Sequence, residues 1–109
     1  MRSLLVASAI TACLMAGATG ALAQSFDCAP YLRKGVVPES VICESPQLAA
    51  LDVELAGIYE SLMDRLPRSA ANNLRNNQRS WLAARNSCGF NANCLVGMYR
   101  SRIGVLNSY

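Results

Sequence analysis

Hydrophobic residues recur every three or four positions along the middle of the chain. They are spaced 3, 4, 3, 4 and 4 residues apart, as Leu48, Leu51, Leu55, Ile58, Leu62 and Leu66. This spacing is the period of one buried face of an α-helix. Ser45 can cap the first free backbone N–H groups, Pro46 fits the first helical position, and Pro67 ends the pattern. The pattern predicts a helix over about residues 45–66, with an apolar stripe that the rest of the chain must cover.

Two further helices are predicted after this one. The first spans about residues 68–88 and has a thinner apolar face, made of Leu74, Trp81 and Leu82 with Ala70, Ala71, Ala83 and Ala84. Gly89 can end it in the left-handed conformation that glycine tolerates. The second spans about residues 92–107, can be capped by Asn91 or Asn93, and carries Leu95, Met98, Tyr99, Ile103 and Leu106 at helical spacing.

The segment before the long helix is irregular, because Pro30, Gly35 and Pro38 interrupt any periodicity. A short helical turn follows over residues 38–43, with Val41 and Ile42 facing inward. Helices separated by turns predict an all-α fold: a small disulfide-stapled helical bundle or bent helical hairpin.

The first 23 residues carry the features of a secretory signal peptide. Arg2 supplies the positive charge, an apolar run extends over residues 4–18, and cleavage is expected between Ala23 and Gln24. The run is too short, and too rich in small residues, for a membrane span, so no integral membrane protein is expected. Lipidation at Cys13 is the alternative, but only twelve residues precede this cysteine and the better cleavage site lies downstream. We expect the mature chain, residues 24–109, in the periplasm or outside the cell.

The mature chain keeps four cysteines: Cys28, Cys43, Cys88 and Cys94. An even number in a small exported domain indicates two disulfides. Three pairings are possible and the residues alone do not decide among them, although pairing of nearest neighbours is favoured because a turn separates each pair. Zinc binding is disfavoured, since the spacings do not match those of zinc ligands and the chain has no histidine. No metal and no cofactor are expected.

Charge divides the chain into two halves. Residues 27–64 contain seven acids and two basic residues, a net of −5, whereas residues 65–109 contain seven arginines and no acid, a net of +7. In the structural interpretation, the long helix with Asp52, Glu54, Glu60 and Asp64 lies beside the arginine-rich helices. In the functional interpretation, the basic half binds an anionic envelope component, such as phospholipid headgroups or cell-wall polymers. Export disfavours nucleic acid as the partner.

Catalysis is not expected. The chain lacks histidine, the commonest general base, and its cysteines are expected to be oxidised. The carboxylate pairs Asp52/Glu54 and Glu60/Asp64 are interpreted as a solvated helix face rather than a glycosidase-like site. No glycine-rich phosphate loop is present, so no catalytic residue is assigned.

Three motifs together resemble a known family. They are Asp27-Cys28 with Ile42-Cys43 and Pro46-x-Leu48-Ala49-x-Leu51-Asp52-x-x-Leu55-x-x-x-Tyr59; Gln78-Arg79-x-Trp81-Leu82-x-x-Arg85-x-x-Cys88; and Cys94-Leu95-x-x-x-Tyr99-x-x-Arg102-Ile103-x-x-Leu106. They resemble the lysozyme inhibitor LprI-like family of secreted bacterial proteins, over nearly all of residues 24–109. The resemblance implies a compact helical domain in which Cys28 pairs with Cys43 and Cys88 with Cys94. It implies lysozyme inhibition as an activity but carries over no inhibitory residue.

Two groups of residues are candidates for binding. The loop between Cys88 and Cys94 offers Phe90 as an apolar tip, with the amides of Asn91 and Asn93 beside it. A closed loop loses little conformational entropy on binding, which suits the plugging of a sugar-binding cleft. The alternative is a mere connector with Phe90 tucked inward.

The second group is Trp81 with Arg79, Arg85 and Arg102. Arg85 lies one turn after Trp81 and could stack on its ring. In the structural alternative, Trp81 anchors the core against the long helix, and the arginines pair with the acids of that helix.

The chain is therefore predicted to act by binding. One hypothesis is a lysozyme inhibitor that occludes the acidic cleft of a muramidase, approached by a basic surface that includes Arg85, Arg100 or Arg102. The alternative is an envelope interaction module, without lysozyme activity, whose arginine-rich half binds an anionic surface or a partner protein.

Overall fold

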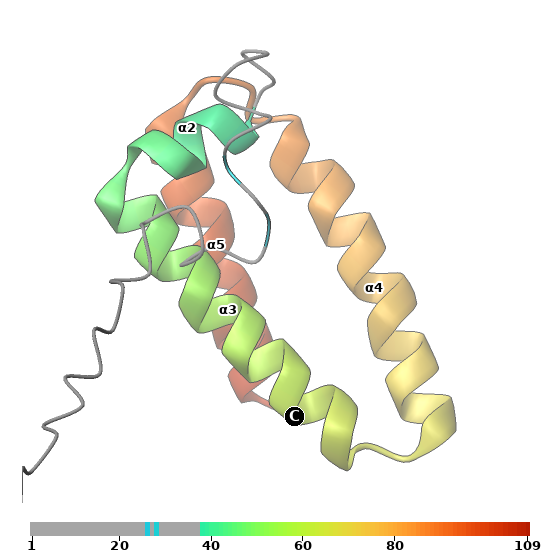
Figure 1. Ribbon diagram of the computed structural model, residues 1–109. Helices are drawn as coiled ribbons and strands as arrows, with labels where there is room; N and C mark the ends of the chain where they lie inside the picture. Colours follow the sequence, from blue (N-terminus) through green and yellow to red (C-terminus); the bar gives the residue numbers. More distant parts are fainter. Residues whose placement is uncertain (1–25, 27, 29–37) are drawn as a thin grey trace, which may run out of the picture.

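The structure, a computed structural model, describes Phe26, Cys28 and residues 38–109. The predicted signal peptide, Cys13 and the irregular segment up to residue 37 lie outside these residues, apart from Phe26 and Cys28. The described residues form four helices, α2 (Glu39–Glu44), α3 (Pro46–Arg65), α4 (Arg68–Asn86) and α5 (Ala92–Asn107), and contain no strand (Figure 1). The predicted all-α fold is confirmed, and each predicted helix lies within about two residues of the observed one.

The helix ends follow from the residues that flank them. Ser45 is the N-cap of α3, where its Oγ accepts a hydrogen bond from the Leu48 backbone N at 3.2 Å, and Pro46 fills the first turn. Of the two asparagines that could cap α5, Asn91 does so: its Oδ1 accepts from the Cys94 backbone N at 3.0 Å. Gly89 has a φ of +59°, the left-handed conformation expected after α4.

The core forms mainly between α3 and α5, which pack on each other more extensively than any other pair of helices. Figure 1 shows the two running side by side, with α2 across the start of α3. The predicted stripe of α3 is confirmed, because it supplies three buried leucines while Leu51, Ile58 and Leu66 pack at the edge. The buried cluster comprises Ile42, Leu48, Leu55, Leu62, Leu74, Leu95, Tyr99, Ile103 and Leu106.

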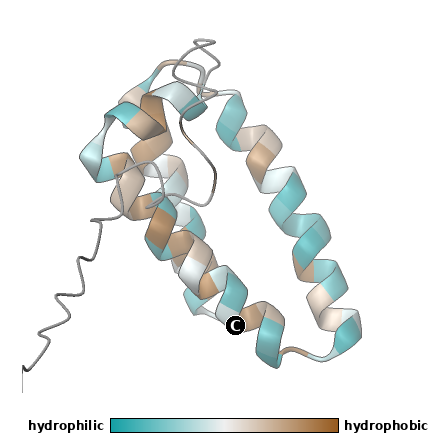
Figure 2. Cartoon of the chain, viewed as in Figure 1, coloured by the Kyte–Doolittle hydropathy of each residue, from teal (hydrophilic) through white to brown (hydrophobic). Residues whose placement is uncertain are grey.

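Helix α4 is held more loosely than α3 and α5. Figure 2 shows mainly hydrophilic residues along it. Leu74 and Ala71 are buried, Trp81 is half-buried, and Leu82 is exposed. The thin apolar face predicted for this helix is therefore confirmed, and much of its attachment must be polar.

Two disulfides fasten the helices. Cys28 pairs with Cys43 and Cys88 with Cys94, with Cα–Cα distances of 5.7 and 5.6 Å. These are the pairs that the family resemblance implies. Loop-closure entropy predicts stabilisation of about 3 kcal/mol for the first and about 2 kcal/mol for the second. Within the described part of the chain, no helix combines the length and apolar character needed to cross a membrane.

Candidate functional site

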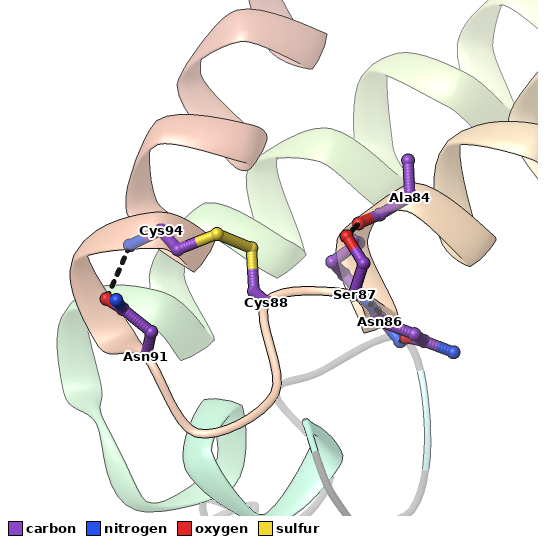
Figure 3. Close-up of a disulfide and its surroundings, with 7 residues drawn as sticks. Ala84, Asn86, Ser87, Cys88, Asn91 and Cys94 are labelled. Carbon is purple, nitrogen blue, oxygen red and sulfur yellow. Dashed lines mark hydrogen bonds between the residues drawn. A yellow bond between two sulfur atoms is a disulfide. The ribbon is translucent and has the colours of Figure 1, made fainter.

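The loop from Gly89 to Asn93 closes on itself at the junction of α4 and α5. Figure 3 shows the Cys88–Cys94 disulfide across its base and the hydrogen bond from the Cys94 backbone N to Asn91. The Asn91 backbone N also donates to the Cys88 carbonyl oxygen at 3.1 Å. One covalent bond and two hydrogen bonds therefore hold a loop of five residues.

Phe90 projects from this loop, with 70 % of its surface exposed. The alternative in which it is tucked inward is wrong. Asn93 is also exposed. The side-chain oxygen of Asn91, by contrast, accepts the hydrogen bond that caps α5. The loop thus presents one large apolar side chain, with an exposed amide three residues later, on a backbone held by the disulfide and two hydrogen bonds.

The base of the loop is anchored in the rest of the protein. The Cys88 backbone N donates to the Arg85 carbonyl oxygen at 3.0 Å, and the Ser87 Oγ donates to the Ala84 carbonyl oxygen at 2.5 Å (Figure 3). Cys88 packs against the core, and Leu95, directly after the second cysteine, is fully buried. The loop is consequently anchored to the end of α4, the start of α5 and the core beneath them.

A buried polar network lies next to this anchor. The Tyr99 hydroxyl group donates to Asp52 Oδ1 at 2.7 Å and accepts from Arg85 Nη1 at 3.2 Å. Arg85 Nη2 donates to Glu39 Oε1 at 3.0 Å, and the Arg85 side chain also donates to Asn86 Oδ1. Arg85 of α4 thereby contacts side chains of α2 and α5, and Tyr99 extends the network to Asp52 of α3.

The expectation that Asp52 lies on a solvated helix face is wrong, since only 2 % of it is exposed. Its position explains this. Asp52 follows Leu48 by four residues and precedes Leu55 by three, so helical geometry places it on the buried stripe. Burial of a carboxylate requires hydrogen-bond donors, and the Tyr99 hydroxyl group is one.

Tyr99 is fully buried, and its ionisation is suppressed. Burial raises the pKa of its hydroxyl group far above the ordinary value of 10, and the nearby Asp52 carboxylate raises this pKa further. The Arg85 guanidinium lowers it by a smaller amount. Tyr99 therefore stays neutral and remains a hydrogen-bond donor across the physiological pH range.

Arg85 and Arg102 are not surface residues, contrary to the predicted basic surface. They are only 4 % and 6 % exposed. Arg102 Nε donates to Gln78 Oε1 at 2.9 Å and its Nη1 donates to Asn77 Oδ1 at 2.5 Å, which ties α5 to α4. Burial lowers the pKa of Arg102. Its Nη2 is buried and has no partner among the described residues.

The pairing of Arg85 differs from the structural alternative, which expected the arginines to pair with the acids of α3. The salt bridge found among the described residues joins Arg85 to Glu39 of α2. Glu54, Glu60 and Asp64 are exposed. The sequence signal for the actual pairing is weak, because Glu39 and Arg85 lie on different helices, 46 residues apart.

Trp81 packs against α5 and also lines a groove next to the long helix. Its ring contacts Tyr99 edge to face, with centroids 5.3 Å apart and planes at 72°. The predicted stacking of Arg85 is confirmed, with its guanidinium carbon 5.9 Å from the centre of the Trp81 ring. Trp81 is thus positioned from one side by two buried neighbours.

A groove of about 310 Å³ lies between α3 and α4. Leu55 and Tyr59 line it from α3, and Arg75, Gln78, Arg79 and Trp81 line it from α4. Arg79, a candidate binding residue, is exposed at this groove and not at the loop. In the described part of the chain, no group of three histidine, cysteine or acidic side chains is placed to hold a metal ion.

The fold and the closed loop define a small disulfide-stapled helical domain. The family model described as Lysozyme inhibitor LprI matches residues 33–106, and the chain therefore belongs to the LprI lysozyme inhibitor family. Comparison with curated proteins and with solved structures gave no significant match.

Proposed function

We propose that this chain is an exported inhibitor that blocks the substrate cleft of a lysozyme-type muramidase with its Cys88–Cys94 loop. Membership of the LprI family supports the inhibitory activity. The choice of the loop rests on one observation: Phe90 is 70 % exposed on a segment that a disulfide and a helix cap already hold in place.

Both the apolar area of Phe90 and the order of its loop favour binding. Complete burial of a phenylalanine side chain contributes about 1.5–3 kcal/mol. A loop that is ordered before binding loses little entropy on association, so most of this gain remains as affinity. The exposed amide of Asn93 can form hydrogen bonds with the polar groups that line a sugar-binding cleft.

In this proposal, ion pairs between arginines of the chain and carboxylates of the muramidase cleft contribute little to binding. Arg85 and Arg102 are engaged inside the protein, which leaves five exposed arginines in the second half of the chain: Arg65, Arg68, Arg75, Arg79 and Arg100. Contact through an apolar tip changes little with ionic strength, whereas binding of an exposed basic surface to an anionic envelope is weakened by salt. This difference separates inhibition from the alternative, an envelope module.

The test is a titration of the oxidised mature chain into a lysozyme assay on cell-wall substrate, with two lysozyme types and direct binding measured at low and moderate salt. We expect saturable inhibition near one-to-one stoichiometry that varies little with salt. Phe90→Ala should weaken it about tenfold or more. Val105→Ala removes an exposed apolar side chain from α5, outside the loop, and should leave inhibition unchanged.

Absence of binding to either lysozyme at micromolar concentration would contradict the proposal for those enzymes. If Phe90→Ala inhibits as strongly as the unaltered chain, the loop is not the inhibitory site. Salt-sensitive binding to anionic vesicles or to cell walls without lysozyme would favour the envelope module instead.

We also propose that the chain acts in the periplasm or outside the cell, after removal of its signal peptide. Export with cleavage after Ala23 predicts a mature protein that begins at Gln24. Mass spectrometry of the protein from the producing cell would measure this. A mature protein that begins at a lipidated Cys13 would contradict release and would place the inhibitor on a membrane.

A further inference from the structure

The groove between α3 and α4 is separate from the proposed inhibitory loop, since none of its lining residues belongs to residues 88–94. Its volume of about 310 Å³ is close to the lower limit of small-molecule sites, and it can hold a ligand of the size of one sugar ring. The residues that line it combine apolar, aromatic and donor groups.

One donor in the groove lacks a partner. Gln78 is only 8 % exposed, and its Oε1 accepts the hydrogen bond from Arg102 Nε at 2.9 Å. Its Nε2 donates to no described residue, although Gln78 lines the groove. Because Gln78 lines the groove and this N–H has no partner in the described part of the chain, it is available to a ligand acceptor such as an acetamido carbonyl oxygen.

The α4 side of the groove is cationic. Arg75 and Arg79 are both exposed, lie four residues apart and therefore face the same way on the helix. Arg75 Nη1 donates to Asn72 Oδ1 at 3.1 Å, and neither arginine forms a salt bridge with a described carboxylate. Asp52 also lines the groove and adds a carboxylate there, because the hydrogen bond that its Oδ1 accepts comes from the neutral Tyr99 hydroxyl group. Two arginines against one carboxylate leave the lining with a net positive charge, which suits a ligand carboxylate.

Two aromatic side chains complete the site. Trp81 and Tyr59 line the groove and are half-buried, and Trp81 is held by Tyr99 and Arg85. A rigid aromatic face offers apolar area to the C–H face of a pyranose ring. We propose that the groove binds an N-acetylated acidic sugar, with its ring on Trp81 and Tyr59, its carboxylate on Arg75 and Arg79, and its acetamido oxygen on Gln78 Nε2.

Trp81 is the sole tryptophan of the chain, so its fluorescence reports directly on the groove. The probe is N-acetylmuramic acid, titrated into the oxidised mature chain. N-acetylglucosamine, which lacks the carboxylate, and glucuronic acid, which lacks the acetamido group, are the matched comparisons. We expect a saturable change in the millimolar range with N-acetylmuramic acid, and binding about fivefold weaker or more with each of the other two sugars.

Arg79→Gln should weaken the binding of N-acetylmuramic acid about fivefold or more. Arg100→Gln makes the same change of charge at an exposed site on α5, outside the groove. This variant should bind N-acetylmuramic acid as tightly as the unaltered chain. Phe90→Ala should also leave this binding unchanged, so the groove and the inhibitory loop are tested separately. No saturable response, equal binding of either comparison sugar, or equal effects of the two arginine variants would overturn the proposal.

Discussion

The hydroxyl group of Tyr99 lies between a carboxylate and a guanidinium in the middle of the core. Tyr99→Phe removes the donor to Asp52 and leaves a buried carboxylate oxygen without that hydrogen bond. We expect the free energy of unfolding to fall by about 1–3 kcal/mol. Urea denaturation at neutral pH measures this, with Tyr109→Phe at an exposed site as the control. Equal stability of the two variants would show that the network contributes nothing.

The same residue gives the protein a dependence on alkaline pH. The pKa of Tyr99 is raised in the folded protein, so between the unfolded value, near 10, and the folded value, the folded state binds more protons than the unfolded state. The stability that Tyr99 provides is complete below about pH 10 and is lost as the pH rises, at up to about 1.4 kcal/mol per pH unit. Urea midpoints between about pH 9 and pH 11 should fall more steeply for the unaltered chain than for Tyr99→Phe. Parallel slopes would contradict this assignment.

At the scale of single elements, the two asparagines of the closed loop have different tasks. Asn91→Ala removes the N-cap of α5 and should lower the free energy of unfolding by about 1 kcal/mol. Asn93→Ala removes an exposed side chain of the first turn and should change stability by less than about 0.5 kcal/mol. Thermal or urea unfolding of both variants measures the difference. Similar losses would mean that the cap does not order the loop.

The helices could be predicted because their signals are local. The leucine spacing of α3, its Ser45-Pro46 start and the glycine after α4 each act within a few residues, and the structure has them as expected. The direction of the charged side chains could not be predicted in the same way. Arg85 points inward because it donates hydrogen bonds to Tyr99 and Glu39, which belong to two other helices. No local sequence pattern contains those partners.

Asp52 is a different kind of failure, because its burial could have been found. It occupies a position of the buried stripe that the leucine spacing already defines. Helical geometry at this position takes precedence over the general preference of a carboxylate for solvent. For the loop, the sequence indicated which residues stand inside the disulfide, and only the fold could establish that Phe90 is exposed.

For the molecule as a whole, the Cys88–Cys94 disulfide joins stability to the proposed activity. Replacement of both cysteines by serine should lower the free energy of unfolding by about 2 kcal/mol and weaken lysozyme inhibition, because the loop must then be ordered on binding. Urea unfolding and the inhibition assay are measured on the same preparation, at a temperature at which the variant is folded. Undiminished inhibition by the folded variant would show that closure of the loop is not needed.

The central claim is that an exposed phenylalanine on a covalently closed loop occludes a lysozyme cleft. The most direct measurement is the inhibition constant of the oxidised chain against lysozyme on cell-wall substrate, compared among the unaltered chain, Phe90→Ala and Val105→Ala. We expect inhibition to weaken about tenfold or more for Phe90→Ala and to be unchanged for Val105→Ala. Inhibition that is the same for all three chains, or absent from the unaltered chain, would contradict the central claim.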